Sequence, residues 1–115
     1  MRFVTISIDG EDAWGYLKGD TAIIVSRAPG WKFPTLRDAI AAGALETIET
    51  TAAGAPTMPL ADVIWRPLIP APGKIICVGI NYAKHREETQ RPVTTYPMIF
   101  MRFADSQTAH EAPIL

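Results

Sequence analysis

Two side chains that can exchange protons, His85 and Glu88, lie three residues apart in the sequence. On a helix this spacing puts two residues on one face, so the imidazole and the carboxylate can touch. A carboxylate beside an imidazole orients the ring and raises its basicity, as general-base catalysis requires. From the spacing alone, a solvated charged face over residues 84–88 is the more economical interpretation, because such pairs are common on exposed helices.

Polar residues further along the chain could bind a substrate. Arg91 and Arg102 could each hold a substrate carboxylate through two parallel hydrogen bonds. A surface ion pair explains Arg91 equally well, whereas Arg102 interrupts an apolar stretch, which favours a binding role. Ser106 and Gln107 follow that stretch and could hydrogen-bond a substrate or cap a turn.

Signals for other kinds of site are weak. His110 could bind a metal ion, but a single histidine beside Glu111 is more often exposed. Cys77 is the one cysteine, which excludes an internal disulfide framework and a multi-cysteine zinc site. It lies in an apolar run, so we expect a buried small hydrophobic residue. Gly79 on its own does not make a phosphate-binding loop.

The elements next to these residues form a strand followed by a helix. Residues 75–78 are continuously apolar, which predicts a strand buried on both faces. The strand should end at Gly79, and the candidate base follows within a few residues. Sites favour loops at strand ends, so this placement supports the catalytic interpretation. A second strand is expected over residues 98–103, after Pro97.

The first third of the chain has the pattern of a β-meander. Asp9-Gly10 is a turn signal between two alternating segments, and a second turn is expected over residues 18–20. Trp14 and Tyr16 should share one face of the sheet. Scattered tryptophans of this kind most often pack in a core, and the chain has three: Trp14, Trp31 and Trp65. The expected strands cover residues 3–8, 13–17 and 21–26.

A short helix is expected over residues 35–42, after the break at Pro29-Gly30. Thr35 is a suitable N-cap, Asp38 takes the capping-box position and Gly43 suits the residue after the helix. Its apolar residues have helical spacing: Leu36, Ala39 and Ile40.

The middle of the chain reads as a connector. Residues 44–53 give a weak helical signal, and residues 56–72 are too rich in proline for a regular helix or a central strand. Residues 63–65 could form an edge strand within this segment. We place a domain boundary near residue 70, with one domain over residues 1–70 and another over residues 71–115.

Composition narrows the functional classes. The 115 residues are 48% hydrophobic and 20% charged, which is typical of a folded soluble protein. The net charge of −1, without a basic block, argues against a nucleic-acid-binding surface. No apolar run is long enough to cross a bilayer, and the N-terminus does not have the layout of a signal peptide. We therefore expect a cytoplasmic protein.

Two segments carry a family resemblance. Residues 72–88, PGKIICVGINYAKHREE, resemble the opening of the catalytic domain in the fumarylacetoacetate hydrolase family, and residues 96–107, YPMIFMRFADSQ, resemble its second block. The resemblance covers residues 68–115 and is typical of bacterial-type members. It implies an α+β, β-rich fold, in which a small N-terminal β domain precedes a catalytic domain of mixed β-roll type. We expect that catalytic domain to be cut short at Leu115.

The resemblance also implies an activity. Family members use Mg²⁺, or Mn²⁺ or Ca²⁺, to hold a 2-oxo acid, and they hydrolyse a carbon–carbon bond in acylpyruvates, decarboxylate or isomerise, often in aromatic-compound catabolism. His85 would be the base, paired with Glu88, and the substrate-binding residues would be Tyr82, Arg91, Arg102, Ser106 and Gln107. Members commonly form homodimers.

Some positions depart from the family pattern. Many members have lysine where this chain has Arg102, and arginine keeps the charge but cannot shuttle a proton. Asn81 stands where longer eukaryotic relatives have a metal-binding aspartate. The metal carboxylates are expected downstream of Leu115, so this chain contributes no metal ligand and by itself would be inactive. The alternative is a catalytically inactive fragment, or a small-molecule-binding or interaction domain without the metal site.

Overall fold

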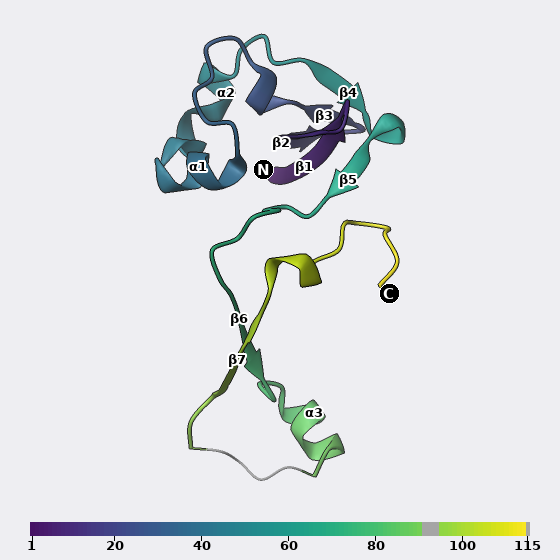
Figure 1. Cartoon of the computed structure of the whole chain (residues 1–115). Helices are drawn as coiled ribbons and strands as arrows, with labels where there is room; N and C mark the ends of the chain where they lie inside the picture. Colours follow the sequence, from purple (N-terminus) through teal and green to yellow (C-terminus); the bar gives the residue numbers. More distant parts are fainter. Residues whose placement is uncertain (91–94, 115) are drawn as a thin grey trace. The chain divides into compact units, whose positions relative to one another are not determined.

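The computed structural model describes residues 1–90 and 95–114, and only the backbone of His85 and Arg86. It divides into two compact units, Met1–Pro70 with Gln107–Leu115, and Ala71–Ser106. Each unit contains one antiparallel sheet, which confirms the β-rich character expected from the sequence (Figure 1). The mixed β-roll expected for the catalytic domain and the domain assignment stay predictions.

The first unit is built on a five-stranded antiparallel sheet. Its centre is a hairpin in which Arg2 pairs with Leu17 and Ile8 with Glu11. Asp9 and Gly10 both have positive φ, 53° and 82°, as a tight two-residue hairpin turn requires. The strand order is β4-β3-β2-β1-β5. The strands are β1 (Arg2–Ile8), β2 (Glu11–Lys18), β3 (Thr21–Ile23), β4 (Thr57–Pro59) and β5 (Ile64–Arg66).

The third strand is shorter than the expected residues 21–26. It ends at Ile23, and Val25–Arg27 forms a 3₁₀ turn, η1. The hydroxyl of Ser26 accepts a hydrogen bond from the backbone N–H of Trp14 at 2.9 Å. The Ser26 hydroxyl thus takes the place of a strand carbonyl as hydrogen-bond acceptor for β2. Val25, in the 3₁₀ turn, is buried in the core.

Two apolar clusters cover the two faces of this sheet. On one face Trp14 is buried with residues from α1, α2 and η1, and its ring contacts Trp31 edge-on at 5.8 Å. The indole N–H groups of Trp14 and Trp31 both donate to the carbonyl of Phe33, at 3.1 and 3.0 Å. On the other face Trp65 packs against a second cluster. The expected packing role of the three tryptophans is confirmed.

Helix α1 (Leu36–Ala41) has the predicted ends. The Thr35 hydroxyl accepts from the N–H of Asp38 at 3.1 Å, and Gly43 has φ 64°. Of the three apolar residues with helical spacing, Leu36 and Ala39 are buried, whereas Ile40 is 47% exposed. A helix of six residues presents one narrow face to the sheet, and Leu36 and Ala39 already fill it. The weak helical signal that follows becomes the 3₁₀ turn η2 (Ala44–Thr47) and α2 (Ile48–Thr51).

The proline-rich segment adds both edge strands. Ile6 pairs with Trp65, so β5 confirms the edge strand expected at residues 63–65. The sequence did not indicate β4, in which Met58 pairs with Ala22. Pro59 is tolerated there because an edge strand leaves one side of its backbone unpaired. The 3₁₀ turn η3 (Leu60–Asp62) joins the two strands.

The second unit is a two-stranded hairpin with one helix. Strand β6 (Ile75–Gly79) pairs antiparallel with β7 (Met98–Arg102), α3 (Ala83–Glu88) follows β6, and the 3₁₀ turn η4 (Ala104–Ser106) follows β7. Among the described helices, none is both long and apolar enough to cross a membrane.

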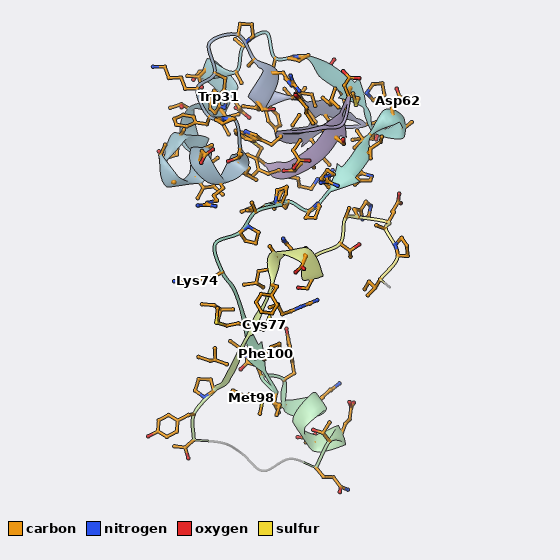
Figure 2. All side chains as sticks on the ribbon, viewed as in Figure 1. Trp31, Asp62, Lys74, Cys77, Met98 and Phe100 are labelled. Carbon is orange, nitrogen blue, oxygen red and sulfur yellow. The ribbon has the colours of Figure 1, made fainter. Side chains whose placement is uncertain are left out.

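The expectation that residues 75–78 are buried on both faces is wrong for this chain. Ile76 and Val78 are 61% and 50% exposed, and Cys77 is half-buried instead of buried. Within the described unit, β6 has one neighbouring strand and no layer packed on it, so its apolar side chains stay open to solvent. Figure 2 shows Cys77, Phe100 and Met98 along this hairpin.

Candidate functional site

The strand-to-helix junction sets up the candidate site. Strand β6 ends at Gly79, which pairs with Met98. A methyl group on Gly79 would lie 3.3 Å from Met98 Sδ and 3.4 Å from Phe100 Cε1, so β7 leaves little room for a side chain there. The next residue, Ile80, adopts a left-handed conformation with φ 55°, and α3 begins at Ala83.

Helix α3 carries both predicted catalytic residues. His85 and Glu88 lie in the same helix at the i,i+3 spacing that places two residues on one face. Glu88 is exposed, which leaves its carboxylate open to a partner or a solute. The imidazole of His85 lies outside the described side chains, so its pairing with Glu88 stays a prediction.

The predicted substrate-binding residues of the second unit fall into two groups. Tyr82 directly precedes α3 and is 78% exposed. Arg102 pairs with Ile75, at the opposite end of the ladder from the pair formed by Gly79 and Met98. Four residues of strand separate these ends, roughly 13 Å. The backbone thus places Tyr82 beside α3 and Arg102 at the far end of the hairpin.

Arg102 and Ser106 already have local partners. A guanidinium N–H of Arg102 donates to the carbonyl of Ser106 at 2.9 Å, and the Ser106 hydroxyl donates to the carbonyl of Phe103 at 2.7 Å. These hydrogen bonds close the turn after β7, in line with the capping alternative for Ser106. A binding role for either residue stays a prediction.

The remaining candidates lie elsewhere or outside the described residues. Gln107 belongs to the first unit, where its side-chain amide donates to the carbonyl of Ile69 at 3.2 Å. His110 is also in the first unit; its ring contacts Trp65 edge-on at 5.4 Å, and its Nε2 lies 3.8 Å from a carboxylate oxygen of Glu111. Arg91 falls outside the described residues.

The described side chains do not fit a metal site. Across residues 1–90 and 95–114, leaving out the side chain of His85, no three histidine, cysteine, aspartate or glutamate side chains come together as a metal ion would require. Mg²⁺ prefers several oxygen ligands in near-octahedral geometry. The described residues therefore do not form a cluster of three such ligands by themselves.

Ile80 is the feature that sequence reasoning missed at this site. Isoleucine disfavours the left-handed region, so its residue type predicts the opposite conformation. The available signal is positional: Ile80 lies between the strand-ending Gly79 and the Asn81-Tyr82 pair that leads into α3.

Comparison with known proteins gives partial matches. No family model matches the chain. The human protein "Oxaloacetate tautomerase FAHD2A, mitochondrial" is 40% identical over 55 residues, which are 48% of this chain and 18% of that protein. "Fumarylacetoacetate hydrolase domain-containing protein 2" of Pongo abelii is 38% identical over 55 residues, again 48% of this chain and 18% of the relative.

An uncharacterized protein of Archaeoglobus fulgidus is 38% identical over 58 residues, which are 50% of this chain and 23% of that protein. The matched segment thus spans less than a quarter of the length of each of these relatives. The matches agree with the resemblance carried by residues 72–88 and 96–107. Over about half of its length, the chain is similar to proteins of the fumarylacetoacetate hydrolase family.

Proposed function

We propose that the whole protein is an enzyme that acts on a 2-oxo acid. Its reaction would be tautomerisation, as named for the relatives, or hydrolysis of a carbon–carbon bond, as the family motif implies. The observation that carries the proposal is the helix α3, which holds His85 and Glu88 at i,i+3 spacing within the family motif. The partial identity with oxaloacetate tautomerases supports it.

Both reactions begin with proton transfer next to a carbonyl group. In tautomerisation, a base takes a proton from the carbon beside the keto group, and the keto oxygen gains a proton as the enol forms. In hydrolysis, the base takes a proton from water, and the resulting hydroxide attacks a carbonyl carbon. The adjacent carbon–carbon bond then breaks, one fragment remains as a carboxylic acid, and the other leaves as an enolate that regains the proton from the protonated base. His85 would be this base in either case, and Glu88 would orient its ring and stabilise the imidazolium form.

A metal ion, expected to be Mg²⁺, Mn²⁺ or Ca²⁺, is part of the family resemblance. When bound, such an ion polarises a carbonyl oxygen and stabilises an enolate. Because the described residues do not fit a metal site, no step above depends on the ion. Its ligands, the expected homodimer and the cytoplasmic location remain proposals for the whole protein.

Assays of the whole protein on two substrates test the proposal and separate the reactions. Enol–keto interconversion of oxaloacetate is followed by ultraviolet absorbance, and cleavage of an acylpyruvate is followed by release of pyruvate. Turnover of either substrate supports an enzyme acting on 2-oxo acids, and the faster reaction identifies its type. A purified, folded protein that turns over neither substrate, with or without Mg²⁺, would contradict the proposal and favour the alternative of a binding or inactive domain.

A further inference from the structure

Ile80 is the β-branched residue among the described non-glycine residues that have a positive φ. Its φ of 55° lies in the left-handed region, where a side chain branched at Cβ crowds the backbone. The other described non-glycine residues with positive φ are Asp9, Gln90 and Glu111, and none of these is β-branched. The structure therefore stores strain at the one residue that turns the chain out of β6.

The neighbours of Ile80 explain why the turn occurs there. A side chain at Gly79 would meet those of Met98 and Phe100 in β7, and Gly79 forms the last pair of the strand with Met98. The chain leaves the sheet at the next residue, and α3 begins three residues later at Ala83. The side chain of Ile80 is half-buried, so part of it is shielded from solvent at this turn.

Glycine would be the simpler residue for this conformation. It populates positive φ without steric cost, but it also leaves the backbone free to adopt many other conformations. Isoleucine adopts a positive φ at a steric cost, but its half-buried, β-branched side chain leaves the backbone fewer alternative conformations than glycine would. Strained residues of this kind persist only where the surrounding structure determines them, and they cluster at functional sites.

We propose that Ile80 is a positioning residue for the candidate base. Its left-handed backbone fixes the direction in which α3 leaves β6, and so fixes where His85 meets the substrate. The inference rests on the proposed function for the role of His85, but the claim about α3 is independent of it. A displacement of about 1 Å at a reacting group can lower a rate about 100-fold, so a modest change in this turn should be measurable.

Kinetics of three variants of the whole protein test the role in catalysis. Ile80→Gly should lower kcat about tenfold to a hundredfold with little change in KM, because substrate binding is retained while the base is less well placed. Ile80→Asn should restore most of kcat, since asparagine tolerates the left-handed region with fewer backbone conformations than glycine. The matched control is Gln90→Gly, at the other end of α3, where φ is 52°. It should leave kcat unchanged.

A distance measurement tests the positioning claim without activity. Spin labels at position 87 in α3 and at position 101 in β7, both exposed in the described chain, report the spread of distances between the two elements. The native residue and Ile80→Asn should give one narrow distribution, and Ile80→Gly a broad one. An equally narrow distribution for Ile80→Gly, or full kcat in that variant, would overturn the proposal. If the native protein turns over no 2-oxo acid, the proposed function fails, and the distances still decide whether Ile80 positions α3.

Discussion

Gly15 of β2 faces the backbone at the end of β3, at Ile23 and Ile24. A methyl group on it would overlap the carbonyl oxygen of Ile23 and lie 3.1 Å from the Cα atom of Ile24. Both obstacles are backbone atoms, which cannot move without shifting β3. The preceding residue, Trp14, is buried in the core. The absence of a side chain at Gly15 is thus what allows the sheet and its core to pack closely.

Gly15→Ala should therefore destabilise the first unit strongly. We expect a loss of about 3 kcal/mol in the free energy of unfolding, because overpacking against backbone cannot be relieved by a side-chain rotation. Urea denaturation followed by tryptophan fluorescence measures the loss. Gly73→Ala is the matched control, since nothing lies within 4 Å of its added methyl group. Unfolding of the two variants at the same urea concentration would contradict the close approach of β3 to Gly15.

Residue type predicted the packing of the tryptophans, but it did not predict the local structure at Gly15 and Ile80. Tryptophans are among the largest apolar side chains, so the packing of Trp14, Trp31 and Trp65 could be expected from the sequence. The need for glycine at position 15 depends on how close the end of β3 lies to it. The left-handed conformation of Ile80 contradicts the preference of its residue type. Both follow from tertiary structure, which local sequence does not specify.

The two sheets differ in how much packing stabilises their strands. The first sheet has a cluster on each face and its central strands are paired on both sides. The hairpin of β6 and β7 has one ladder, and its apolar residues Ile76, Ile99 and Met101 are each at least 60% exposed. A two-stranded hairpin without packing is marginal in water. The two sheets should therefore open with very different free energies.

Hydrogen exchange of the 115-residue chain should show this difference. Amide protons of β1 and β2 should be strongly protected, whereas those of β6 and β7 should exchange close to the rate of an unfolded chain. Exchange followed by mass spectrometry of peptides from the two sheets makes the comparison within one sample. Equal protection of the amide protons of β2 and β6 would contradict this prediction, because it would mean that the hairpin is as stable as the first sheet despite its exposed apolar side chains.

The N-cap of α1 gives a second test at this scale. Thr35→Ala removes the hydroxyl that accepts from the N–H of Asp38 and should lower the free energy of unfolding by about 1 kcal/mol. Thr35→Ser keeps the acceptor and should recover most of that loss. Thr50→Ala is the control, because the exposed hydroxyl of Thr50 donates within one turn and caps no helix start. Urea denaturation of the three variants side by side gives the values, and equal stability of Thr35→Ala and Thr35→Ser would contradict the capping role.

Element prediction succeeded where the signal was local. The cap at Thr35, the glycine after the helix and the hairpin turn at Asp9-Gly10 are short-range signals, and all three are confirmed. Strand β4 was missed because its pairing with β3 joins residues far apart in the sequence. The predicted burial of residues 75–78 was wrong. A continuously apolar strand indicates that its side chains would be more stable if they were packed against other residues, but the described chain does not provide those residues.

At the scale of the whole molecule, the chain combines a five-stranded sheet with a segment that resembles the fumarylacetoacetate hydrolase family. The resemblance to the fumarylacetoacetate hydrolase family could be recognised because residues 72–88 form a long and distinctive motif. The site was predictable only in part, since Tyr82, His85 and Glu88 share one junction while Arg102 lies at the other end of the hairpin. The metal ligands could not be placed, because the described residues do not bring a suitable group together.

Magnesium should accordingly leave the 115-residue chain unaffected. A ligand that binds the folded state raises stability by RT ln(1 + [L]/Kd), so binding would raise the melting temperature with concentration. We expect no change up to millimolar Mg²⁺ in a thermal denaturation scan, with Na⁺ at matched ionic strength as the control. A rise that depends on Mg²⁺ concentration would show that metal ligands lie within this chain.

The turnover of a 2-oxo acid by the whole protein and its His85→Ala variant tests the central claim most directly. We expect His85→Ala to lower kcat at least about 100-fold, as loss of a general base does, while the protein stays folded by circular dichroism. Glu87→Gln, on the same helix, is the matched control and should keep the native kcat. The contradicting result is a His85→Ala variant that turns over substrate as fast as Glu87→Gln, because α3 would then carry no catalytic base.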